Sequence, residues 1–194
     1  MSRVQTLLDA VRGLHAVTPQ LQHFGPWPEG LQDASLEPVP CPAPEVLLSC
    51  LSHTAPRFQD VIHALISAAP DLRWRQTYGA HQVGADFLGA YGYVELFGPN
   101  GQFHCADLRG YLGFWGPNLT YDWHSHPAEE VYFSLAGAAR FDAEGTPLAT
   151  IGPGECRQHA SNQRHRMMTL SQPYLTFALW RGDGLAQNAR MDAA

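Results

Sequence analysis

The stretch YDWHSHPAEEVYFSLAG, residues 121–137, decides how the rest of the sequence is interpreted. His124 and His126 stand two residues apart, and on a strand that spacing points both side chains to one face. Glu130 and Tyr132 share this parity, provided that Pro127 does not shift the register. A metal site needs several nitrogen or oxygen ligands that converge on one point. The stretch therefore predicts a metal site built on a strand.

A further ligand can come from a neighbouring strand. His165 begins the run HRMMT, residues 165–169, whose alternate positions share one face. Three imidazoles and one carboxylate suit Zn, Fe(II), Mn, Ni or Co, and they leave positions open for water or substrate. We predict one divalent transition metal per chain, of undetermined identity, with the ligands His124, His126, Glu130 and His165.

An ordinary amphipathic strand would explain the same residues. Glu130 and Tyr132 could face water while the alternate apolar residues face a core. A single histidine is usually a surface residue or a satisfied core residue. The complete arrangement favours the metal site, because four ligands at compatible spacing seldom arise by accident.

The N-terminal region up to about residue 72 reads as helical. Apolar residues recur at helical spacing over residues 4–14, where Ser2 is a candidate N-cap, and again over residues 58–65. The run PVPCPAP, residues 38–44, cannot lie inside a helix and separates the two segments as a linker.

The following region changes character. From residue 73 to 183, short runs rich in Val, Tyr, Phe and Leu alternate with glycine-bearing turns, which is typical of a sandwich or small barrel. We therefore predict a mainly β protein in which a helical extension, residues 1–72, packs on an antiparallel β-barrel that carries the metal site. Residues 184–194 are expected to form a frayed tail.

Composition excludes several classes of function. A length of 194 residues suits one domain, and a formal net charge of −6 leaves no basic footprint for nucleic acid or an anionic membrane. No apolar run is long enough to cross a bilayer, and the N-terminus lacks the apolar stretch of a signal peptide. We expect a cytoplasmic protein with a small-molecule partner and with free thiols at Cys41, Cys50, Cys105 and Cys156.

The central stretch resembles a known motif. His124, His126, Glu130 and Gly137 match the first cupin motif, HxH-x3-E-x6-G, residue for residue. The second cupin motif is matched at Gly154 and His165, but other residues replace its usual Pro, Gly and Asn, namely Ala160, Asn162 and Thr169. The resemblance implies a cupin barrel, which is a double-stranded β-helix or jelly roll.

A cupin barrel would place the alternate apolar residues of the motif outside. These residues are Val131, Phe133 and Leu135. An exposed apolar face of this kind needs cover, either from the N-terminal helices or from a second subunit in a homodimer.

Residues 116–137 and the His165 segment are similar to a narrower family, the small bacterial cupin lyases that cleave dimethylsulfoniopropionate (DMSP). That resemblance implies β-elimination of a small zwitterionic substrate to dimethyl sulfide and acrylate. It implies that Tyr132 is the base and that Tyr121 lies near the substrate. A tyrosine has a pKa of about 10, so the base would need a nearby cation such as the metal. The same phenol oxygen could also bind the metal in place of His124.

The chemistry of the substrate suggests further residues. A sulfonium group favours aromatic faces, for which Trp123 and Trp180 are candidates, although Trp123 has a parity opposite to that of the ligands. His159 and Arg140 receive no role. Two other functions fit the same ligands: an Fe(II) dioxygenase, and a cupin that binds a small molecule without catalysis.

Overall fold

The computed structural model describes residues 2–41 and 56–192, and its N-terminal part is helical as predicted. Helix α1 (Arg3–Ala16) is capped by Ser2, whose hydroxyl accepts a hydrogen bond from the Gln5 amide over 3.1 Å. Helix α2 (Pro19–Phe24) follows, and α4 (Gln59–Ala68) stands between the short 3₁₀ turns η2 (Pro56–Phe58) and η3 (Ala69–Asp71). Residues 42–44 of the proline-rich run lie outside the described residues.

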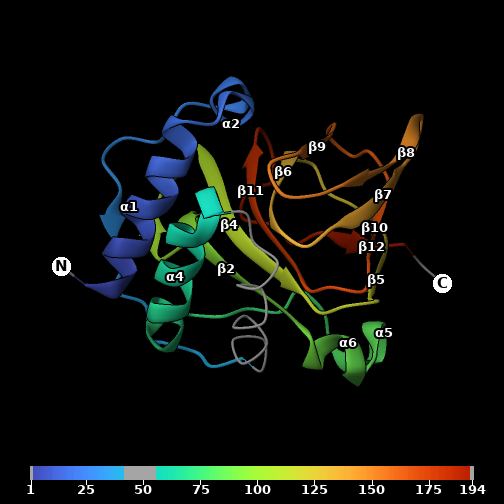
Figure 1. Cartoon of the computed structure of the whole chain (residues 1–194), viewed down its shortest axis with the longest axis horizontal. Coiled ribbons are helices and arrows are strands. Elements are labelled where there is room, and N and C mark those ends of the chain that lie inside the picture. The colour runs from blue at the N-terminus through green and yellow to red at the C-terminus, as the bar shows by residue number, and fades with distance from the viewer. Residues whose placement is uncertain (1, 42–55, 193–194) are drawn as a thin grey trace.

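Two sheets with mostly antiparallel pairs form the rest of the fold, and all their strands except β1 come from the second part of the chain (Figure 1). The larger sheet has the order β1-β3-β2-β4-β11-β6-β9 and the smaller sheet the order β12-β5-β10-β7-β8. The strands of the larger sheet are β1 (Gln32–Asp33), β2 (Tyr91–Gly98), β3 (Phe103–His104), β4 (Leu108–Trp115), β6 (Glu129–Ala136), β9 (Cys156–His159) and β11 (Tyr174–Arg181). Those of the smaller sheet are β5 (Thr120–Ser125), β7 (Ala139–Ala143), β8 (Thr146–Ile151), β10 (His165–Thr169) and β12 (Arg190–Met191). The short helices α5 (Ala80–Val83) and α6 (Ala85–Gly89) precede β2.

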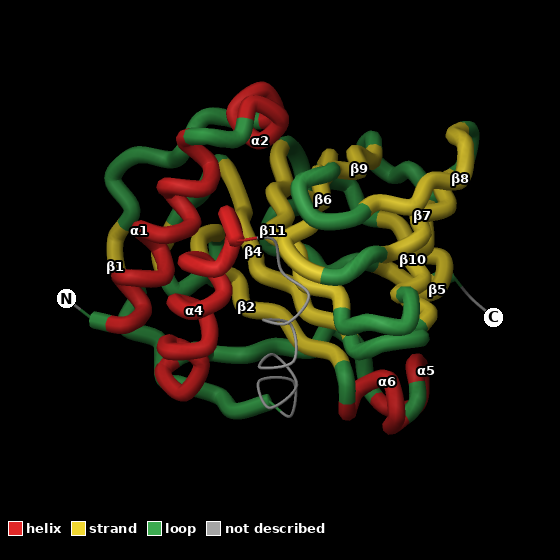
Figure 2. The backbone as a smooth tube through the Cα atoms, in the orientation of Figure 1, coloured by secondary structure: helices red, strands yellow, loops and turns green. Residues whose placement is uncertain are grey.

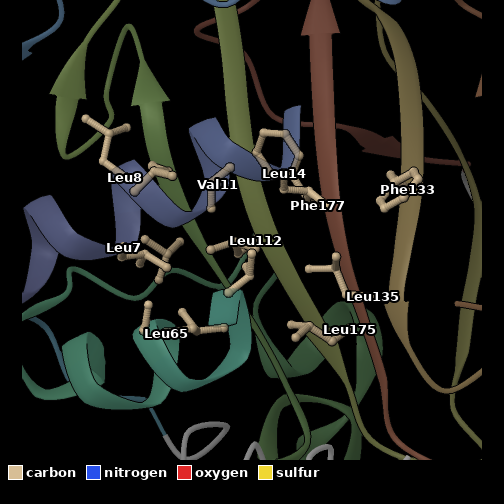
Figure 3. Close-up of a cluster of buried hydrophobic side chains, with 14 of the residues drawn as sticks. Leu7, Leu8, Val11, Leu14, Leu65, Leu112, Phe133, Leu135, Leu175 and Phe177 are labelled. Atoms are coloured by element: carbon tan, nitrogen blue, oxygen red, sulfur yellow. The ribbon is translucent and has the colours of Figure 1, made fainter. Parts of the chain in front are cut away.

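An outer hydrophobic core lies between the N-terminal helices and the larger sheet (Figure 2). Figure 3 shows Leu7, Val11 and Leu14 of α1 together with Phe133 and Leu135 of β6 in this core. Phe58, just before α4, meets Phe133 edge to face, with ring centroids 5.6 Å apart. The apolar face of the motif is thus covered by the chain's own helices, and no second subunit is needed to explain it.

An inner core lies between the two sheets and is unusually rich in aromatic residues. All seven tyrosines of the chain belong to it, together with Trp115, Trp180 and Phe141. Glu130 and Tyr132 point into this core and are 0% and 2% exposed. The alternative of a solvent-facing strand is therefore wrong.

The segment expected to fray is ordered over its described part. Leu185 is buried, and β12 pairs with β5. Arg109 supplies the reason, since it donates hydrogen bonds to the main-chain carbonyls of Leu185 and Gln187. These long-range contacts leave no local pattern in the sequence.

The structure also bears on two predictions from the sequence, the free thiols and the lack of a membrane-spanning segment. Cys105 and Cys156 are free thiols, whereas Cys50 lies outside the described residues. Among the described helices, none has both the length and the apolar character required to span a bilayer.

Candidate metal centre

The structure gathers the four sequence-predicted ligands in the inner core. His124 lies on β5, Glu130 on β6 and His165 on β10, while His126 lies in the connection between β5 and β6. All four side chains are at most 2% exposed. Nε2 of His126 lies 3.1 Å from Oε2 of Glu130, and Nε2 of His165 lies 3.4 Å from the same oxygen.

The motif does not form one continuous strand, which corrects the simple parity prediction. β5 ends at Ser125, β6 begins at Glu129, and the two strands belong to different sheets. Pro127 lies between them and has no amide hydrogen with which to continue a ladder. The ligands therefore converge from two facing sheets instead of alternating along one strand.

Main-chain carbonyls set the orientation of each imidazole. The Nδ1 atoms of His124, His126 and His165 lie 2.7, 2.9 and 2.8 Å from carbonyl oxygens. A carbonyl only accepts, so each Nδ1 carries a proton, and the atom that each ring can offer to a cation is Nε2. Nε2 of His165 has no hydrogen-bond partner among the described residues. Buried lone pairs that face a carboxylate fit a divalent cation well.

The four ligands are not equivalent in the structure. Among the described residues, the ligand atoms of His126, Glu130 and His165 lie within 4.8 Å of one another. His124 stands beside this group, with its ring 4.2 Å from that of His165 and stacked on that of Tyr121 at 4.0 Å, measured between centroids. Three residues thus form a preassembled ligand group, and His124 lies against it.

Glu130 is fixed by two aromatic donors as well as by the histidines. Its Oε1 accepts a hydrogen bond of 2.6 Å from the indole nitrogen of Trp180 and another from the hydroxyl of Tyr111. Burial alone would raise the pKa of the Glu130 carboxyl, but the hydrogen-bonded imidazole of His126 and the nearby imidazole of His165, in their charged form, hold that pKa well below its usual range. The carboxylate is therefore ionised and available to a cation.

Tyr132 stands on β6 two residues after Glu130, inside the same core. Burial raises the pKa of its hydroxyl well above 10, and the negative charge of Glu130 and a hydrogen bond with Tyr111 raise it further. Without a cation nearby, Tyr132 is consequently a neutral phenol at physiological pH.

A small cavity lies beside these groups. Its volume is about 30 Å³, which is room for roughly one or two water molecules. Trp180 forms part of its wall and stacks on His126 with ring centroids 4.0 Å apart. The lining residues are Thr77, Tyr91, Tyr93, Arg109, Tyr111, Trp115, Tyr121, His124, His126, Tyr132, Trp180, Asn188 and Ala189.

This arrangement can be compared with known proteins. The profile of the dimethylsulfoniopropionate lyase family matches residues 25–176, which is most of the chain. The chain belongs to the DMSP lyase family. Its members are carbon–sulfur lyases, and the family match agrees with the resemblance in the sequence.

Individual DMSP lyases match over nearly the whole length. The DMSP lyase DddQ of Ruegeria pomeroyi is 36% identical over 179 residues, which cover 92% of this chain and 89% of the relative. Its crystal structure superposes with a TM-score of 0.91 over 97% of this chain and 95% of that chain, at 34% identity. A crystal structure described with the DMSP lyases RdDddP and RnDddQII gives a TM-score of 0.95 over 98% of each chain, at 39% identity. The expected cupin fold is confirmed.

The aromatic residues predicted near the substrate divide into two groups in this DMSP lyase. Tyr121, Tyr132 and Trp180 line the cavity. Trp123 does not, because it lies on the opposite face of β5, where its ring contacts the guanidinium groups of Arg164 and Arg166 at 5.3 and 4.9 Å. In the sequence, the parity of Trp123 is opposite to that of the ligands, and this already indicated a position on the other face of the strand.

Three other residues had no role predicted from the sequence. Tyr111 was missed, although its parity on β4 could have shown that it faces the inner core. His159 is buried and stacks on His165, and neither of its ring nitrogens has a hydrogen-bond partner within the described residues. Arg140 is exposed on β7, away from the cavity.

Proposed function

We propose that this chain is a metal-dependent lyase that cleaves DMSP to dimethyl sulfide and acrylate. The observation that supports this proposal is the juxtaposition of a buried His126–Glu130–His165 ligand group and Tyr132 within an aromatic cavity. When bound there, a divalent metal would supply the Lewis acid that holds the substrate carboxylate and lowers the pKa of nearby hydroxyl groups. His124 would be a fourth ligand or would yield its position to Tyr132.

Tyr132 is the proposed base. As a phenolate it removes a proton from the carbon next to the substrate carboxylate. The electron pair released forms the carbon–carbon double bond of acrylate while the carbon–sulfur bond breaks and dimethyl sulfide leaves. The proton stays on the Tyr132 oxygen until it returns to solvent. Because burial raises the pKa of Tyr132, the phenolate requires the positive charge of the centre beside it.

Aromatic side chains supply the binding site for the sulfonium group. Tyr91, Tyr93, Tyr111, Trp115, Tyr121 and Trp180 line the cavity. Their ring faces are electron-rich and attract a cation without offering a nucleophile. Hydrogen bonds hold some of these rings in place: the hydroxyls of Tyr78 and Tyr121 lie 2.9 Å apart. The cavity is smaller than DMSP, so the walls must move apart when the substrate enters.

The deciding experiment measures dimethyl sulfide and acrylate from purified protein given DMSP. It compares untreated protein, chelated protein, and chelated protein with Zn, Fe(II), Mn, Ni or Co restored. We expect equal amounts of both products that depend on metal. In the matched variant, Tyr132→Phe, we expect bound metal to remain while turnover falls by at least about 100-fold. Folded, metal-loaded protein that forms no product would exclude the lyase, and oxygen uptake assays would then test a dioxygenase.

A further inference from the structure

A segment near the C-terminus forms part of the cavity wall. We call residues 185–191 the C-terminal strap. Asn188 and Ala189 of the strap line the cavity, and Leu185 is buried in the inner core. Arg190 and Met191 pair with Ser125 and His124 at the end of β5. The strap thus lies directly against the proposed metal centre, although it is more than 50 residues from the HxH motif in sequence.

Arg109 on β4 anchors this strap from inside the protein. Its Nη1 donates hydrogen bonds to the carbonyl oxygens of Leu185 at 3.4 Å and Gln187 at 3.1 Å. Arg109 is only 5% exposed. A buried guanidinium is costly unless it is paired. Nε of Arg109 lies 3.2 Å from Oε2 of Glu95, whose Oε1 accepts a hydrogen bond of 2.8 Å from the Asn100 amide.

The same guanidinium also contacts the opposite part of the site. Arg109 and Glu130 both stand opposite Trp180 in the register, on the two strands that flank β11. The guanidinium carbon of Arg109 lies 4.7 Å from the Trp180 ring centroid, a cation–π contact. Trp180 in turn donates its hydrogen bond to Glu130 and stacks on His126. One side chain therefore touches both the strap and the tryptophan that holds two metal ligands.

We propose that Arg109, held by Glu95, is a positioning residue that fixes the C-terminal strap and Trp180 as two walls of the substrate cavity. The guanidinium is suited to this task because separate nitrogens face the carbonyls and the carboxylate, whereas a lysine has a single nitrogen on a flexible stem. The expected effect on KM for DMSP rests on the proposed lyase function. The anchoring of the strap by Arg109 rests on the structural contacts alone.

The test compares the parent chain with three variants. Arg109→Met combined with Glu95→Gln removes both buried charges, so that neither is left unpaired. Arg109→Lys keeps the charge and loses the fork. Arg3→Met is the matched control, because it breaks an exposed ion pair with Asp71 on the N-terminal helix.

Hydrogen exchange tests the anchor independently of catalysis. The Gln187 amide donates to the Gly184 carbonyl and the Asp192 amide to the Trp123 carbonyl. In the double variant we expect peptides that contain these amides to exchange at least about 10-fold faster, while β4 and β11 peptides keep their protection. Arg109→Lys should speed up exchange in the same peptides by a smaller factor. If the double variant does not fold, Arg109→Lys alone tests the anchor. Unchanged strap exchange in the variants would overturn the proposal.

Steady-state kinetics tests whether the strap is a wall of the substrate site. We expect KM for DMSP to rise about 10-fold or more in the double variant, with kcat changed by less than about threefold and bound metal retained. A faster-exchanging strap with an unchanged KM would overturn the role in substrate binding. If the parent protein forms no dimethyl sulfide, the lyase proposal fails, and the exchange experiment still decides whether Arg109 holds the strap.

Discussion

The imidazole rings of His159 and His165 lie face to face, with centroids 3.9 Å apart and planes inclined by 10°. One edge of His165 is held by its hydrogen bond to the Gln163 carbonyl, and one face is held by His159. Neither nitrogen of His159 has a partner among the described residues, so its contribution to the site is the flat ring itself. Mutation of residues that orient metal ligands commonly lowers metal affinity by about 10- to 100-fold.

His159 is therefore expected to support metal binding by packing. His159→Ala removes the stack and should weaken metal affinity by about 10-fold or more. His159→Phe keeps a flat ring and should retain affinity within about threefold. Competition with a chromophoric chelator measures both. Equal losses in the two variants would mean that a nitrogen of His159 matters instead.

Burial of the same histidine predicts a pH dependence of stability in metal-free protein. Burial, and after it the charge of His165, lower the pKa of His159 from 6.5 to about 3. Between those two pH values the unfolded chain binds a proton that the folded chain does not. The contribution of His159 to the free energy of unfolding is therefore fully present above pH 6.5 and decreases as the pH falls. The slope is at most about 1.4 kcal/mol per pH unit for this histidine.

Urea unfolding at pH 7, 6 and 5 in the presence of chelator measures that slope. In His159→Phe the free energy of unfolding should depend less steeply on pH. His63→Gln is the control, because His63 is exposed, and it should leave the pH dependence unchanged. Identical slopes for the parent and His159→Phe would contradict the prediction.

The geometry also predicts that the histidine ligands are unequal. His126 and His165 form the preassembled group with Glu130, and His124 lies beside it. His126→Ala or His165→Ala should leave little metal bound after dialysis, whereas His124→Ala should retain most of it. Elemental analysis of metal per chain decides the point. Loss of metal in His124→Ala as complete as in His165→Ala would make His124 a full ligand.

The outer face of β6 predicts a stability effect separate from the site. Phe133 is buried between β6 and the N-terminal helices, against Phe58. Phe133→Ala should lower the free energy of unfolding by about 3–5 kcal/mol, while Val17→Ala at an exposed position should change it by less than about 0.5 kcal/mol. Denaturant titration measures both, and a small loss for Phe133 would show that the helices do not cover this face tightly.

The sequence was sufficient for features that depend on local spacing. The alternation of β6, with Glu130 inward and Phe133 outward, and the apolar stripes of α1 and α4 follow from a period of 2 or 3.6 residues. These patterns predicted the helical and the β part of the fold, and they predicted that the motif's apolar face needs cover, either from the helices or from a second subunit. The first motif and His165 predicted side chains that the structure brings together in the inner core, although Pro127 made the geometry different from one strand.

The features that were missed depend on which strands become neighbours. Tyr111 and Tyr132 are 21 positions apart, yet both stand opposite Ala178 of β11, one on each side. The small side chain of Ala178 leaves room between two large rings. The C-terminal strap is held by Arg109 in the same way, across the fold. Such pairings are set by sheet order and register, which periodicity does not encode.

Tyr111 gives the most direct test of this cross-strand arrangement. Its hydroxyl donates to Oε1 of Glu130, on the side of the carboxylate away from the histidines, and it shares a hydrogen bond with Tyr132. Tyr111→Phe removes both bonds and keeps the ring in the cavity wall. Since Trp180 still donates to the same oxygen, we expect metal affinity to fall only about 10-fold.

The effect of Tyr111→Phe on catalysis should exceed its effect on binding of the metal. A base that has lost its hydrogen-bonded neighbour is free to leave the position from which it reaches the substrate proton, so kcat at saturating metal should fall by about 10-fold or more. Tyr174→Phe is the matched control, because Tyr174 is also buried in the inner core but does not line the cavity. If Tyr111→Phe and Tyr174→Phe have the same kcat at saturating metal, Tyr111 contributes to packing alone.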